Sequence, residues 1–248
     1  MLDINLIVLG FFVGVFAQLI DATLGMAYGV MSNSFLLSLG IPPAPASASI
    51  HTAEVFTTLA SGTSHLTFGN VDKKLVKKLI FPGVIFGAFG AFVLSSIPGN
   101  TLKPIISAYL LLMGILILVR VFRPIKFSIR EKHIPIIGSV SGFLDAIGGG
   151  GWGPVTTTTL ISGGHNPRLT IGSVNLTEFF VTLAEASTFF ILLGLLNIDL
   201  VLGLLIGGCI ISPFSAFTCK KIPTKFLMFI VALLIIGLSI WTIFLTVL

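Results

Sequence analysis

The chain has 248 residues, of which 55% are hydrophobic and 9% are charged, and its mean hydropathy is +1.10. A soluble domain carries about 25% charged residues, so this composition excludes a surface that faces water on all sides. The net charge of +5 does not indicate a nucleic-acid partner, because the basic residues stand in short segments between apolar stretches. We therefore expect an all-α, multi-pass protein of the lipid bilayer, whose helices each need about 20 apolar residues.

The first apolar stretch, residues 1–20, has no basic start and no small-residue cleavage site. We interpret it as a retained transmembrane helix rather than as a signal peptide. It runs into "DATLGMAYG" (21–29), where an acid and glycines interrupt the apolar pattern. Irregular backbone at membrane depth is tolerated only inside protein or beside water, so we expect a broken or re-entrant helix buried in the fold here.

Segment 47–68 combines helical length with a polar face. Its polar residues alternate at spacings of three and four, which places them on one side of a helix; they are His51, Glu54, Thr58, Ser61 and His65. A charged side chain at the centre of a membrane helix costs about 2.5–3.5 kcal/mol, so this face should point towards protein or water. The basic segments 72–78, 120–132 and 218–225 predict cytoplasmic loops.

The second half of the chain repeats this order of features. "DAIGGGGWGPVTTTT" (145–159) is a second break, "GGHNPRLT" (163–170) follows it, and 172–190 carries a second polar face formed by Asn175, Glu178, Thr182 and Glu185. Matching residues lie 124 positions apart, half the length of the chain; among the pairs are Asp21 and Asp145, Tyr28 and Trp152, Ser49 and Ser173, and Glu54 and Glu178.

The loops of the two halves differ in charge, since 72–78 is basic and its counterpart 196–199 is not. This opposite bias favours inverted repeats over parallel ones. We expect one transmembrane domain made of two inverted repeats, 1–124 and 125–248, with about four helical segments each, an arrangement of secondary transporters that bind substrate near the midplane.

A helix that begins at membrane depth points free N–H groups and the positive end of its dipole into the protein, which favours an anion. We predict that an anion binds where the two breaks face each other. The candidate binding residues are Gly25, Tyr28, His51, Gly149, Gly150, Gly151, Trp152, Thr156, Arg168, Ser173 and Asn175. An ordinary interface role is the alternative for Arg168.

Ionised carboxylates repel an anion, so the acids call for a different role. We assign Glu54, Glu178, Asp21 and Asp145 to proton coupling or gating, with helix capping as the alternative for the two aspartates. His65 and Glu185 have no like counterparts in the other half, which leaves their roles open.

These features resemble the sulfite exporter TauE/SafE family of membrane transporters. The resemblance rests on "DATLGMAYGV", "DAIGGGGWGPV" and "IPPAPASASIHTAEVFTTLASGTSHLTFGNVD" (41–72), and it extends over essentially the whole chain. It implies export of sulfite or organosulfonates across the cell (inner) membrane. The first half departs from the glycine run, reading "TLGMAYG" where the second half reads "IGGGGWG", so the two half-sites are not expected to be equivalent.

Two other features of the sequence limit the possible functions and the possible cross-links. No motif of a soluble enzyme or of a nucleotide-driven pump is present, so we expect neither enzymatic activity nor a cofactor or metal. Cys209 and Cys219 stand ten positions apart on one apolar segment, too far along a helix for a disulfide. A transporter of cations or of other small organic anions, and an intramembrane enzyme or sensor, stay open as alternatives, as does the oligomeric state.

Overall fold

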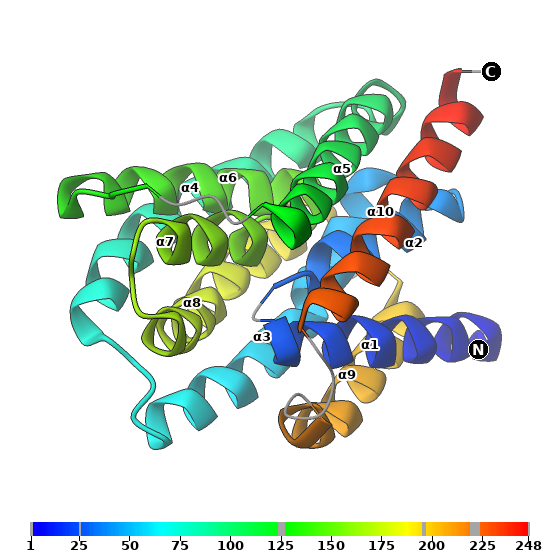
Figure 1. The fold of residues 1–248 in the computed structure, drawn as a ribbon. Helices are drawn as coiled ribbons and strands as arrows, with labels where there is room; N and C mark the ends of the chain where they lie inside the picture. The colour runs from blue at the N-terminus through cyan, green and yellow to red at the C-terminus, as the bar shows by residue number, and fades with distance from the viewer. Residues whose placement is uncertain (1, 25, 124–126, 195–196, 219–223, 248) are drawn as a thin grey trace.

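The protein is a bundle of helices (Figure 1). The computed structural model describes residues 2–24, 26–123, 127–194, 197–218 and 224–247, and no strand occurs among them. The first half contains α1 (Ile4–Leu24), α2 (Tyr28–Ser38), α3 (Pro43–Thr67), α4 (Lys73–Ser96) and α5 (Gly99–Phe122). The second half contains a 3-10 turn (Glu131–His133), α6 (Ile134–Gly148), a π-helical segment (Trp152–Thr157), α7 (Thr158–Ser162), α8 (Pro167–Leu193), α9 (Ile198–Thr218) and α10 (Thr224–Val247).

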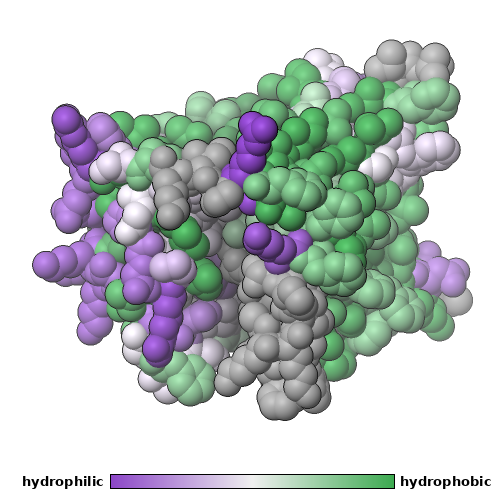
Figure 2. Space-filling model, in the orientation of Figure 1, coloured by the Kyte–Doolittle hydropathy of each residue, from purple (hydrophilic) through white to green (hydrophobic). Residues whose placement is uncertain are grey.

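Five helices among the described residues are long and apolar enough to cross a membrane, namely α1, α4, α5, α8 and α10. Their exposed side chains are largely apolar, and green hydrophobic residues cover much of the surface in Figure 2. These observations confirm the all-α membrane fold. Each half holds five α-helices among the described residues, where about four helical segments were expected, because each break divides a segment, α1 from α2 and α6 from α7.

Both breaks interrupt helices where the sequence predicts them. The first break separates Leu24, the last residue of α1, from Tyr28, the first of α2. In the second half, Gly149 ends α6 with a φ of 63°, in the left-handed region that favours glycine. The 15 residues of α6 form about 22 Å of helix, which is shorter than a hydrocarbon core of about 30 Å. This helix therefore does not span a bilayer alone.

Helix pairs in the two halves correspond to each other. α1 packs along α9, and their counterparts α6 and α4 pack along each other in the same way. Glycines 124 positions apart allow both approaches: a Cβ on Gly14 would lie 3.0 Å from the Leu204 Cα, and one on Gly138 would lie 3.2 Å from the Leu79 O. α3 crosses α8, its own counterpart, and α5 likewise packs on α10. That the halves cross the membrane in opposite senses stays a prediction.

Hydrophilic residues gather at one end of the bundle, on the left in Figure 2. There the Lys78 Nζ donates to the Glu131 Oε2 at 2.5 Å, which joins the basic segments 72–78 and 120–132. The N-terminus lies on the other side of Figure 1, where the Asp3 N donates to the Asp199 Oδ2 at 3.1 Å. The two basic segments thus share one end of the bundle, as expected of two loops on the same side of a membrane.

Candidate functional site

The two breaks contact each other at the centre of the bundle. Gly29, at the start of α2, lies so close to the second break that an added Cβ would be 2.6 Å from the Gly150 Cα. The Asn33 Nδ2 donates to the Gly148 O at 2.5 Å, and the Tyr109 OH donates to the Gly150 O at 3.3 Å. Residues from α2 and α5 of the first half therefore hold the second break in place.

Asp145 caps the second break with both its side chain and its backbone. Its Oδ1 accepts hydrogen bonds from the Gly151 N at 2.5 Å and the Trp152 N at 2.8 Å. Its carbonyl oxygen accepts from the Gly150 N at 3.0 Å. Two N–H groups that we expected to bind an anion are thus bound by an anionic side chain of the protein itself.

The first break is capped more weakly. The Asp21 Oδ1 accepts one hydrogen bond, from the Tyr28 N at 3.4 Å. The Tyr28 OH in turn donates to the Leu204 O of α9 at 3.4 Å. Gly25, the remaining candidate of this break, lies outside the described residues. The contacts of both aspartates fit the capping alternative.

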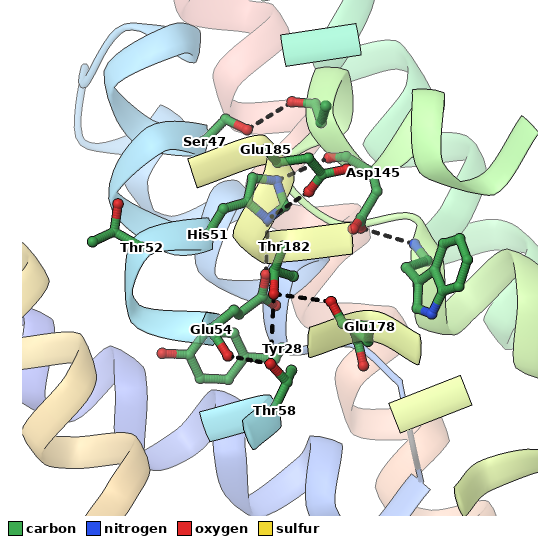
Figure 3. A network of polar contacts seen from close by, with 12 residues as sticks. Tyr28, Ser47, His51, Thr52, Glu54, Thr58, Asp145, Glu178, Thr182 and Glu185 are labelled. Carbon is green, nitrogen blue, oxygen red and sulfur yellow. Dashed lines mark hydrogen bonds and ion pairs between the residues drawn. The ribbon is translucent and has the colours of Figure 1, made fainter. Parts of the chain in front are cut away.

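His51 is the centre of the polar network in Figure 3. Its Nδ1 lies 2.9 Å from the Glu54 Oε2 on the same helix and 3.2 Å from the Glu185 Oε2 on α8. Its Nε2 lies 3.3 Å from the carbonyl oxygen of Asp145. The ring also stacks on Phe189, with centroids 6.1 Å apart. Glu185, whose role the sequence left open, therefore faces His51 directly.

The polar faces of α3 and α8 meet each other, as their spacing predicts. The hydroxyl oxygens of Thr58 and Thr182, counterparts in the repeat, lie 3.5 Å apart. The Ser61 Oγ donates to the Asn175 Oδ1 at 2.8 Å. Glu178 is buried on the same face of α8. This contact between the two halves is lined with hydrogen-bonding groups rather than apolar ones.

Three other candidate residues have surroundings that differ from those of the His51 network. Arg168 and Ser173 lie near the start of α8, and Thr156 follows the second break. Arg168 is exposed and donates to the Asn70 Oδ1 at 2.5 Å and the Phe68 O at 3.3 Å, at the basic end of the bundle. The Ser173 Oγ accepts from the Asp72 N at 2.8 Å. The Thr156 hydroxyl is fully buried and has no hydrogen-bond partner among the described residues. The structure thus does not bring Arg168 and Ser173 to the contact between the breaks.

His51, Asp145 and Glu185 are the described residues that could together hold a metal ion, since their donor atoms lie within 4.8 Å of one another. The distances from the His51 Nδ1 to the two glutamates are hydrogen-bond distances. The arrangement therefore fits a shared proton better than a metal.

Sequence reasoning missed several residues that build the site. Asn33, Ser47 and Tyr109 belong to no repeated motif, yet Asn33 and Tyr109 bind the second break and the Ser47 Oγ donates to the Ala146 O at 2.6 Å. One signal was available: the chain has two tyrosines, and both lie beside a break.

Comparisons with known proteins agree with this architecture. The chain is 47% identical over 220 residues to the probable membrane transporter protein YtnM of Bacillus subtilis (strain 168), an alignment that covers 85% of this chain and 73% of the relative. No solved structure matches the chain. The profile of a transporter family, described as sulfite exporter TauE/SafE, matches residues 10–242. The chain therefore belongs to the TauE/SafE family of membrane transporters.

Proposed function

We propose that this protein is a secondary transporter that exports small sulfur-containing anions, sulfite or organosulfonates, across the cytoplasmic membrane by alternating access. One observation carries the proposal: a helix start at the centre of the bundle already binds an anionic group, the Asp145 carboxylate, through the Gly151 and Trp152 N–H groups. The oxygens of sulfite and of a sulfonate accept hydrogen bonds from N–H groups as a carboxylate does. A substrate anion takes the place of Asp145 in this proposal.

The groups proposed to bind the anion belong to the two breaks and to the polar face of α3. They are the backbone of Gly149–Gly151 and Trp152, the first-half residues Gly25 and Tyr28, the unpartnered hydroxyl of Thr156, and His51, which adds positive charge when protonated. Arg168, at the basic end, attracts anions to the entrance through its charge. Ser173 and Asn175 line the route between the entrance and the site.

Alternating access requires that the two halves, 1–124 and 125–248, change their relative position. The crossing of α3 and α8 is the element proposed to change. Its contacts are hydrogen bonds between small polar groups, such as Ser61 with Asn175, and such groups exchange partners at lower cost than a close-packed apolar contact.

Proton linkage follows from charge. Glu54 and Glu178 are buried near the proposed anion site, and two ionised carboxylates there would repel the substrate. We propose that they carry protons when the anion is bound. Glu54, 2.9 Å from His51, also sets the charge of that ring.

The test is a flux assay in liposomes. Purified protein should release sulfite or a small organosulfonate, and a pH gradient should change the rate. Glu54→Gln should alter the pH dependence of that flux, whereas a variant with an unchanged pH profile would remove Glu54 from the coupling. Failure of every sulfur anion in the panel would refute the proposed substrate class.

A cation transporter is the second candidate, because three potential ligand atoms of His51, Asp145 and Glu185 lie so close together. Thermal unfolding distinguishes the two. Stabilisation by sulfite or a sulfonate favours the anion, and stabilisation by a divalent metal at equal concentration favours the cation.

A further inference from the structure

We propose that Glu185 and His51 form a site at which this transporter binds a coupling proton, and that only one of the two related contacts between α3 and α8 carries such a site. The inference rests on the proposed function and extends it to a residue, Glu185, whose role the sequence leaves open. It draws on the hydrogen bonds of the His51 ring, on the burial of the Glu185 carboxyl group and on the chemistry of the pair that matches them in the repeat.

The hydrogen bonds of His51 restrict where a proton can be. Its Nε2 lies 3.3 Å from the carbonyl oxygen of Asp145, which accepts hydrogen bonds and cannot donate, so Nε2 carries a hydrogen. The Nδ1 then faces two glutamate oxygens, those of Glu54 and Glu185, at 2.9 and 3.2 Å. Nδ1 has one position for a hydrogen and an ionised carboxylate only accepts, so these contacts are hydrogen bonds only if a proton stands on Nδ1 or on a glutamate oxygen.

Besides His51, Glu185 faces the carboxyl group of Asp145. It has no solvent exposure, and neither of its oxygens forms a hydrogen bond of good geometry with the described residues. An ionised carboxylate left in that state is very costly, because burial removes its hydration without replacement. A proton on Glu185 removes that charge. A proton on the facing His51 Nδ1 instead gives the carboxylate a positively charged partner. The proton comes from water and converts one carboxylate to an acid, or one imidazole to an imidazolium.

A glycine on the neighbouring helix makes room for the carboxyl group. A Cβ on Gly87 of α4 would lie 2.5 Å from the Glu185 Oε1, so any other residue there would displace the carboxyl group. Glycine at this position thus keeps Glu185 close to His51.

A hollow between α3 and α8 lies next to the residues that pack on the pair. A cavity of about 320 Å³ is lined by Thr52, Ser187 and Phe189, among others. Phe189, which stacks on the His51 ring, separates this cavity from the buried pair.

The repeat contains a neutral copy of this pair. The counterpart of His51, 124 positions later, is Asn175, and the counterpart of Glu185, 124 positions earlier, is Ser61. These two residues also contact each other across α3 and α8, at 2.8 Å. The same contact between α3 and α8 is thus present twice. At one position it is formed by an ionisable pair, His51 and Glu185. At the other it is formed by the amide of Asn175 and the hydroxyl of Ser61, which do not titrate.

Several other titratable groups surround His51 and contribute to the pH response of any variant. They are Glu54 on α3, Glu178 beside Glu185 on α8, Asp145 on α6, Asp21 on α1 and Tyr28 on α2. The test must therefore compare variants in one background rather than interpret a single pH profile.

The test measures the unfolding temperature of the purified protein in nanodiscs without any anion, between about pH 5 and pH 8, where histidine and buried acids titrate. The folded wild type holds the proton and the unfolded chain releases it, so stability should fall as the pH rises. Glu185→Gln should lose most of this pH-dependent shift. Ser61→Ala, which breaks the neutral copy of the contact, should keep it.

A second pair of variants keeps the carboxyl group and moves it. Gly87→Ala should reduce the pH-dependent shift because it displaces Glu185 from His51. Gly237→Ala, at a helical position with no other atom within 4 Å of the added Cβ, is the control for the substitution itself and should keep the shift.

Three results would overturn the proposal. Glu185→Gln could keep the wild-type shift; Glu185→Gln and Ser61→Ala could reduce it equally, which indicates a structural contact; or Zn²⁺ could stabilise the wild type and not Glu185→Gln, which indicates a metal. Because no anion is present, a failure of sulfite flux in liposomes refutes the proposed substrate and leaves this test valid.

Discussion

Asp145→Ala should destabilise this protein more than Asp21→Ala, although the two aspartates are counterparts in the repeat. Asp145 accepts two backbone hydrogen bonds through one carboxylate oxygen, from Gly151 and Trp152. Asp21 accepts one, from Tyr28 at 3.4 Å. All of these groups are buried, so water does not replace the lost acceptor.

The magnitudes follow from the number of donors left unpaired. A buried donor without a partner costs about 1–3 kcal/mol, so Asp145→Ala, which leaves two, should cost about 2–6 kcal/mol. Asp21→Ala leaves one such donor, the Tyr28 N–H, and should cost about 1–3 kcal/mol. Asp145→Asn should fall between them, because its amide oxygen still accepts but neutral hydrogen bonds are roughly half as strong as charge-assisted ones.

Unfolding of the purified variants in mixed micelles, followed by tryptophan fluorescence, measures these differences. Trp152 is fully buried beside the cap, so its emission should change as the second break opens. Equal losses for Asp145→Ala and Asp21→Ala would refute the assignment of Asp145 as the stronger cap. A larger loss for Asp145→Asn than for Asp145→Ala would refute the role of hydrogen bonding.

The other predictions concern packing, the entrance and the basic end. Gly29→Ala should abolish folded protein, measured by size-exclusion chromatography, because the added Cβ would lie 2.6 Å from the backbone of Gly150. Arg168→Gln should leave the maximal flux unchanged but reduce its sensitivity to ionic strength, since an exposed charge acts on substrate approach. Lys78 holds the pKa of Glu131 below its ordinary value through a hydrogen bond and its charge. This ion pair should therefore stabilise the protein at neutral pH and lose its effect as the pH falls below about 4, and Glu131→Gln should remove that acid-side change in unfolding temperature.

The sequence predicted the elements of the fold that follow from local pattern. The two breaks end helices beside Asp21 and Asp145, as the glycines indicate. The polar faces of α3 and α8 meet, as their helical spacing and the cost of exposing acids to lipid require. Composition alone was sufficient for the membrane class.

What the sequence could not predict depends on contacts between distant segments. The N–H groups of the second break are bound by Asp145 rather than left free, a choice that depends on the backbone path of three glycine residues. Asn33 and Tyr109 reach that break from helices with no matching residue in the repeat. Arg168 was a candidate because of its type, but its position at the start of α8 places it beside Asn70.

The differences between the halves bear on the relative energies of the two transport states. In a transporter made of inverted repeats, the inward-open and outward-open states arise when the two halves exchange conformations, so identical halves would give states of equal energy. This chain concentrates its ionisable contacts on one side: His51 lies against Glu185 and the carbonyl of Asp145, while the matching pair of Asn175 and Ser61 is neutral. A proton at His51 and Glu185 then stabilises one state more than the other. Under the proposed mechanism, this inequality makes the balance between the two states depend on pH, while the gradients of proton and substrate set the direction of net transport.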